Sequence, residues 1–95
     1  MNIPNLSSKV KISPNILFRE MQGEAVLLNI ETGVYFGLDP AGTSIWHLFE
    51  KKKKLKEVLE TLLTEYQIEP KDCKEDLLRF TSSLEKNGLV ELHAE

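Results

Sequence analysis

The chain has a single cysteine in 95 residues and no long apolar run, and each scarcity excludes a class of protein. One cysteine cannot close an intramolecular disulfide, which excludes the disulfide-stapled secreted scaffolds. A membrane-spanning helix needs about 20 consecutive apolar residues, and the sequence offers none. The N-terminal stretch MNIPNLSSKVKIS lacks the apolar core and cleavage site of an export signal. The sequence therefore predicts a small cytoplasmic protein without a membrane partner.

Basic residues are scarce relative to acidic ones. The chain carries 12 Lys+Arg against 15 Asp+Glu, which gives a net charge of −3. Nucleic-acid-binding domains usually show a basic excess, so nucleic acid is not an expected partner. The one basic run is Lys51 to Lys54, with Lys56 beyond it. We interpret it as a solvated turn, with attraction of an acidic peptide or protein surface as the alternative.

The first half of the chain after a polar arm shows strand patterns. Residues 1–12 are predicted to be a flexible arm, with a short extended piece at 10–12, and residues 13–95 a single domain. Three strands are expected, at 16–21, 25–30 and 34–38, and Gly33 supplies the left-handed position of the second hairpin turn. Alternation places Val26, Leu28 and Ile30 on one face of the second strand and Leu27 on its other face. It places Val34, Phe36 and Leu38 on one face of the third strand and Tyr35 on its other face.

The second half of the chain has helical periodicity. Asp39-Pro40 predicts an N-cap and first helical position, opening a helix at about 41–51. A second helix is expected at about 54–66, and Pro70 opens a third that ends near Gly88, before a short strand at 89–92. The predicted fold class is α+β: a three-stranded antiparallel sheet, three helices and a short terminal strand, in the manner of a winged helix-turn-helix.

The residues that usually carry catalysis are few and dispersed. His47, His93 and Cys73 are widely separated, without the spacing of a metal site. Cys73 falls at a core position of the third helix, where cysteine behaves as an inert apolar residue. We therefore predict no catalytic residues, no metal, no cofactor and no enzymatic activity.

The third strand, residues 34–38, is the most informative binding candidate. It lies at a sheet edge unless another segment covers it, and neither charge nor proline protects it. One interpretation is a core strand shielded by the N-terminal arm. The other is an edge that an extended peptide joins as an additional strand, and the pattern alone leaves both open.

The sequence also resembles a known family. The strings EAVLLN and TGVYFGLD, followed by Gly42, Ile45-Trp46 and the later Gly88-Leu89-Val90, resemble the pyrroloquinoline-quinone synthesis protein D (PqqD) family over residues 10–92. The resemblance implies a RiPP recognition element, which is a domain that binds the leader of a ribosomally synthesised precursor peptide. It also implies a separate modifying enzyme, a radical-SAM protein in the type system.

The same resemblance implies the site. The leader is expected to add to the third strand and to pack against the third helix. Thr81 stands where the family often has an apolar residue, so we expect a more polar floor there. The implied peptide-binding residues are Val34, Tyr35, Phe36, Gly37, Leu38, Leu77, Phe80, Thr81 and Leu84.

Other functions remain possible at this stage. A winged-helix nucleic-acid-binding regulator is the main alternative, although the third helix carries balanced charge. A domain that scaffolds an enzyme without touching its substrate is another. Neither the precursor peptide, the pathway nor the oligomeric state can be read from the residues.

Overall fold

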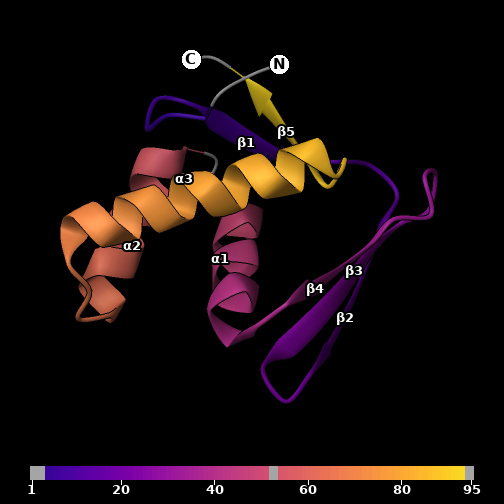
Figure 1. The fold of residues 1–95 in the computed structure, drawn as a ribbon, viewed down its shortest axis with the longest axis horizontal. Coiled ribbons are helices and arrows are strands. Elements are labelled where there is room, and N and C mark those ends of the chain that lie inside the picture. Colours follow the sequence, from indigo (N-terminus) through magenta and orange to yellow (C-terminus); the bar gives the residue numbers. More distant parts are fainter. Residues whose placement is uncertain (1–3, 52–53, 94–95) are drawn as a thin grey trace.

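The structure, a computed structural model, describes residues 4–51 and 54–93. Strands β1 to β4 come first along the chain, helices α1 to α3 follow, and β5 closes the chain (Figure 1). Their bounds are β1 Lys9–Ile12, β2 Ile16–Met21, β3 Glu24–Asn29, β4 Tyr35–Leu38, α1 Pro40–Lys51, α2 Leu55–Glu65, α3 Pro70–Lys86 and β5 Val90–His93. The predicted α+β class and the order of the predicted elements are confirmed.

Strands β2, β3 and β4 form an antiparallel meander in that order. The β2–β3 turn consists of Gln22 and Gly23, both at positive φ (55° and 82°), as a two-residue hairpin turn requires. Gly33 precedes β4 with φ 76°, which confirms the left-handed position predicted for it. These turns set the register, in which Leu27 pairs with Phe36 and Val26 with Gly37.

The predicted grouping of residues on β3 is confirmed, and the structure shows that the face carrying Leu27 is the buried one. Ala25, Leu27 and Asn29 are buried, whereas Val26 and Ile30 are 46% and 56% exposed. On β4 the buried and half-buried residues are Leu38 and Phe36, as the alternation suggested. Strand β3 is apolar on both faces, so hydrophobicity could not choose between them. The hairpin register decides which face of β3 is buried, because it places Leu27 opposite Phe36.

Helices α1 and α3 show the start and stop signals that the sequence predicts. Asp39 accepts a hydrogen bond from the Gly42 N–H at 2.7 Å through Oδ1, which confirms it as the α1 N-cap. Pro70 opens α3, and Gly88 follows its end with φ 75°. The core packs between the helices and both sheets, and its largest fully buried side chains include Trp46, Phe49, Leu27, Leu55, Leu77 and Leu84.

The N-terminal segment is more ordered than the predicted arm. The extended piece expected at 10–12 is strand β1, which pairs antiparallel with β5 in a separate two-stranded sheet. Val10 is 1% exposed and belongs to the hydrophobic core. Burial of this side chain together with the ladder to β5 fixes residues 9–12, so a flexible arm reaching residue 12 is not what the structure shows.

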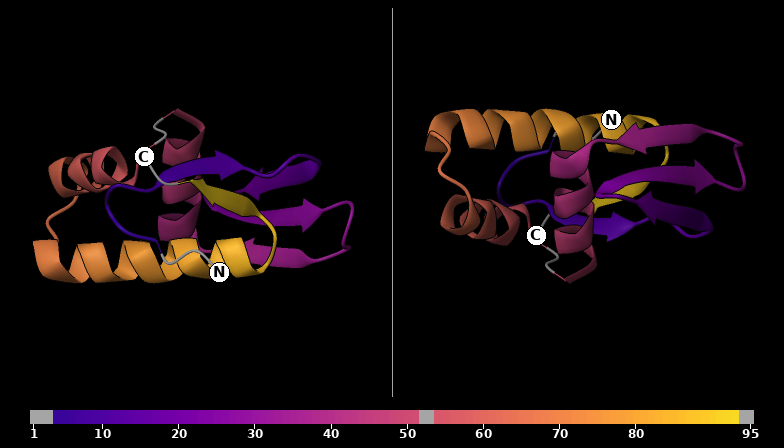
Figure 2. Two further views of the ribbon diagram at one scale, coloured as in Figure 1. Left: turned by 90° about the horizontal axis from the view of Figure 1, so that it is seen from above. Right: turned by 90° about the horizontal axis from the view of Figure 1, so that it is seen from below.

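Helix α3 runs alongside the β4 side of the sheet (Figure 2). Two contacts fix this arrangement. At one end, the Phe80 ring packs against Gly42, where a Cβ would lie only 3.3 Å from the ring. At the other, Asn29 Nδ2 donates to the Gly88 carbonyl at 2.8 Å, joining the β3–β4 hairpin to the end of α3. Strand β4 is thus held in place beside the C-terminal half of α3.

Candidate functional site

Strand β4 is an edge strand. The sheet order is β2–β3–β4, and both β1 and β5 belong to the other sheet, so neither the N-terminal segment nor the terminal strand pairs with β4. The interpretation in which the N-terminal arm shields this edge is therefore wrong for the described part of the chain. The sequence left both interpretations open, and no segment within residues 4–51 and 54–93 pairs with this edge.

The backbone groups that β4 offers follow from its ladder. Asn29 N–H donates to the Val34 carbonyl at 2.9 Å, which identifies these two as a hydrogen-bonded pair. Hydrogen-bonded and non-hydrogen-bonded pairs alternate in an antiparallel ladder. The backbone groups of Phe36 and Leu38 consequently face β3, and those of Tyr35 and Gly37 face away from the sheet. A strand that pairs with β4 would bond to Tyr35 and Gly37.

The side chains of the five predicted strand residues lie on two faces. Tyr35 is 70% exposed on the outer face, and Gly37 leaves open space beside it, with nothing within 4 Å of a built Cβ. Phe36 is half-buried and Leu38 is buried, both on the inner face toward α1. Val34 is half-buried and lies one residue before the strand.

The four predicted residues of α3 do not all reach the surface. Leu77, Thr81 and Leu84 are at most 1% exposed and belong to the interior. The Thr81 hydroxyl donates to the Leu77 carbonyl at 2.7 Å, so the polar floor expected from this residue is not formed. Phe80 is half-buried and packs at the point where β4 leads into α1. The structure brings Phe80 together with β4 and places the other three beneath the surface.

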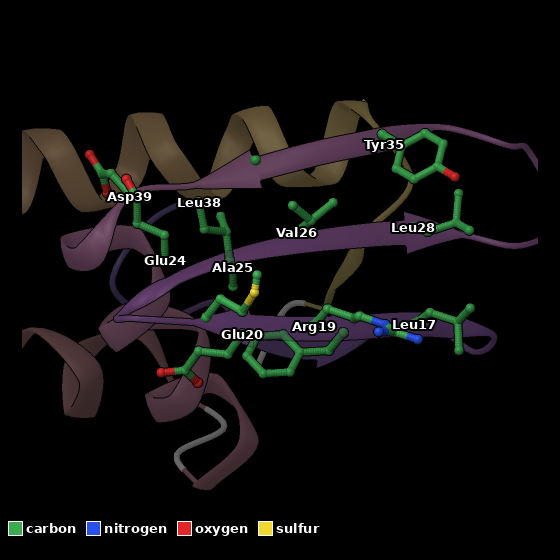
Figure 3. Close-up of a pocket in the computed structure, with 13 residues that line it drawn as sticks. Leu17, Arg19, Glu20, Glu24, Ala25, Val26, Leu28, Tyr35, Leu38 and Asp39 are labelled. Atoms are coloured by element: carbon green, nitrogen blue, oxygen red, sulfur yellow. The ribbon is translucent and has the colours of Figure 1, made fainter.

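The outer face of the sheet carries an apolar hollow that the sequence analysis did not identify (Figure 3). Its lining comes from all three strands, and Figure 3 shows Leu17, Val26, Leu28 and Tyr35 side by side on this face. Arg19 and Glu24 bring charged groups to the same hollow. The signal was present as apolar residues on both faces of β3. The hollow adjoins the open edge of β4.

His47 connects the sheet to α1 through two carboxylates. Its Nε2 lies 2.8 Å from Glu20 Oε1 on β2, and its Nδ1 lies 2.9 Å from Glu50 Oε1 on α1. Both contacts are hydrogen bonds only when the imidazole is protonated, because a neutral ring carries one N–H. The hydrogen bond with Glu50, followed by that with Glu20, raises the pKa of His47 above its ordinary value of 6.5. The Phe18 ring lies edge-on at 5.4 Å.

We call the Glu20–His47–Glu50 cluster the clamp, and we expect it to make the free energy of unfolding depend on pH. Because the folded-state pKa is raised, the clamp's contribution is complete below about pH 6.5 and is lost as pH rises through the folded-state value. Urea unfolding of the natural chain should give a smaller free energy of unfolding at alkaline than at mildly acidic pH. His47→Gln should flatten that part of the profile, and identical pH profiles for both proteins would contradict the clamp.

Neither the cysteine nor a metal-holding cluster offers a reactive site in the described residues. Cys73 is buried, and burial, followed by the nearby Asp76 charge, raises the pKa of its thiol. A raised pKa disfavours the reactive thiolate. Within residues 4–51 and 54–93, no three His, Cys, Asp or Glu side chains are grouped so as to hold a metal ion. In the same ranges, no helix has the length and apolarity to cross a bilayer.

Comparisons with known proteins point to one family. The sequence matches the family model for coenzyme PQQ synthesis protein D (PqqD) over residues 24–90. That range includes β3, β4 and all three helices. No curated protein sequence matches the chain.

Two solved structures share the fold. TbiB1 in complex with the TbiA(beta) leader peptide is 35% identical, with a TM-score of 0.81, over 90% of this chain and 99% of that one. Lasso peptide synthetase B1 complexed with the leader peptide is 24% identical, with a TM-score of 0.77, over 87% of this chain and 98% of that one. The second likeness is one of fold alone. Both relatives were solved with a leader peptide bound.

Proposed function

This chain belongs to the PqqD family, and from that premise we propose that it is a leader-peptide-binding domain. It captures the leader of a ribosomally synthesised precursor peptide as an added strand on β4. It then presents the rest of the precursor to a separate modifying enzyme. The domain itself performs no catalysis.

The observation that carries the proposal is the open edge of β4. Tyr35 and Gly37 direct their backbone N–H and C=O groups away from the sheet, and no described segment pairs with them. An extended peptide satisfies such groups by main-chain pairing, and side-chain contacts then add specificity. The 35% identity to TbiB1, a protein solved with its leader peptide, supports this use of the edge.

Side chains on both faces of β4 would surround the added strand. Alternate leader residues on the inner side would lie toward Phe36 and Phe80, beside α3. Those on the outer side would extend the apolar face formed by Val26 and Tyr35. We include Val34 and Leu38 in the binding strand, and we assign Leu77, Thr81 and Leu84 to the packing that supports α3 beneath it.

The nucleic-acid alternative has less support. Helix α3 would be its recognition helix, yet the apolar face of α3 is buried in the core, and its exposed face carries acidic residues such as Asp72 and Asp76 beside its basic ones. Phosphate binding needs an excess of basic side chains. A peptide requires only the strand edge, which the structure provides.

The chemical class of the modifying enzyme is proposed from the family resemblance. A radical-SAM enzyme is the partner that the family resemblance suggests for quinone-cofactor synthesis. Such an enzyme would receive the precursor from this domain. The family and the open edge support the capture step and not a particular pathway.

An amide-shift titration tests the capture step. A leader peptide encoded beside the gene should shift the backbone amides of Tyr35 and Gly37 most strongly, because these gain new hydrogen bonds. Smaller shifts should follow at Phe80 through ring contacts. The amides of α2 serve as an internal control and should not move. Shifts confined to α3, with Tyr35 and Gly37 unchanged, would overturn strand addition.

A further inference from the structure

Lys54 of the basic run lies next to strand β1, which carries two exposed lysines. Lys9 and Lys54 form an isolated antiparallel bridge, so their side chains emerge next to each other. Lys11 lies two residues along β1 on the same face, and Lys51 and Lys56 are exposed on either side of the α1–α2 connection. We define the lysine face as Lys9, Lys11, Lys51, Lys54 and Lys56. Lys52 and Lys53 lie outside the described residues.

This arrangement is unfavourable for the isolated domain. Lys9 and Lys54 lie directly opposite each other in their bridge, and like charges placed in this way destabilise a strand pair. Lys54 is the N-cap of α2, and Lys56 lies in the first turn of that helix. Positive charge at both positions also opposes the helix dipole, which favours acidic residues there. Lys51, in the last turn of α1, is the exception, because the helix dipole favours a cation there.

Within the described residues, no carboxylate lies within ion-pair distance of Lys9, Lys11, Lys51 or Lys56. Glu91 is the register partner of Lys11, but its carboxylate lies 3.4 Å from His93. By contrast, Arg79 on α3 has a partner in Asp76 at 3.2 Å. Positive charge on Lys9, Lys11, Lys51 and Lys56 therefore remains available to a partner.

The lysine face lies away from the proposed peptide site. In both views of Figure 2, β1 and the C-terminal end of α1 lie on the opposite side of the molecule from α3 and β4. A protein bound to the lysine face would leave the β4 edge open. We propose that the lysine face docks an acidic protein surface. Resting on the proposed function, we infer that this surface belongs to the enzyme that modifies the captured peptide.

The proposal is tested with a hexaglutamate peptide as the probe, titrated into the isotopically labelled full chain at low salt. Amides of Lys9, Lys11, Lys51 and Lys56 should shift, and the shifts should shrink at physiological salt because exposed charges are screened. The variant Lys9→Glu/Lys11→Glu/Lys56→Glu should lose binding by at least about tenfold. The matched control Lys71→Glu/Lys74→Glu/Lys86→Glu changes the net charge equally on α3 and should retain it.

Each alternative outcome is decisive. Equal losses in both triple variants would show a net-charge effect and overturn the proposal. Tighter binding of a DNA duplex, or of vesicles containing anionic lipid, than of hexaglutamate at equal charge would assign the face to a different partner. If the glutamate variant unfolds, Lys9→Gln/Lys11→Gln/Lys56→Gln replaces it, with the same loss expected. Leader affinity, measured on the same samples, should stay unchanged, which separates this test from that of the β4 edge.

Discussion

Replacing Gly37 with proline should reduce leader affinity by at least about tenfold while the domain remains folded. The Gly37 N–H faces away from β3, so proline removes a donor for the added strand without breaking a bond of the existing ladder. One hydrogen bond is worth roughly 0.5–1.5 kcal/mol, and about 1.4 kcal/mol is a factor of ten. The proline ring also occupies the space of the incoming peptide. Fluorescence anisotropy with a labelled leader measures the loss.

Gly37→Ala is the matched control for this experiment. It keeps the N–H, and its Cβ would meet nothing within 4 Å, so affinity should change little. A circular-dichroism melting curve checks that the proline variant is folded. Undiminished leader binding by folded Gly37→Pro would show that the peptide does not pair with β4.

Replacing Asn29 with alanine should cost the domain about 2–4 kcal/mol of unfolding free energy, the largest stability effect expected here. Asn29 is only 6% exposed, and its Oδ1 accepts from the N–H groups of Glu31 and Thr32 at 2.9 and 3.2 Å. Its Nδ2 donates to the Gly88 carbonyl at 2.8 Å. Alanine leaves these groups without their partner, and urea denaturation measures the cost.

Asn29→Asp separates the two halves of this network. Aspartate keeps the acceptor for the β3–β4 turn but places an oxygen against the Gly88 carbonyl, so its cost should diminish at acidic pH, where a protonated carboxyl can donate. Since Asn29 ties the hairpin to α3, both variants should also weaken leader binding. A loss below about 1 kcal/mol for Asn29→Ala would mean that the network contributes little.

Local sequence signals determined most of the elements. Strand β2 was predicted with its observed bounds, Gly33 and Gly88 were placed as turn and stop signals, and Asp39 as a cap. These features depend on neighbours within four residues, through hydrogen bonds and allowed backbone angles, so the sequence specifies them directly. The unprotected character of residues 34–38 was equally legible, because protection would have required charge or proline within the strand.

Features formed between distant segments were not legible. The pairing of β1 with β5, the buried Asn29 contact to Gly88 and the Glu20–His47–Glu50 clamp each join residues far apart in the chain. Burial of Thr81 was not predicted either. Its hydroxyl bonds to a carbonyl of its own helix, and a threonine methyl can then fill part of the core.

The sequence by itself determined the small α+β domain, the scarcity of catalytic groups and a strand at residues 34–38 without protecting charge or proline. Only the tertiary structure decided which face of β3 is buried, that β4 is left uncovered beside α3, and that Lys9 lies against Lys54. The reason is physical. Periodicity specifies that a strand has two faces, but hairpin register and packing against α1 select the face that leaves water.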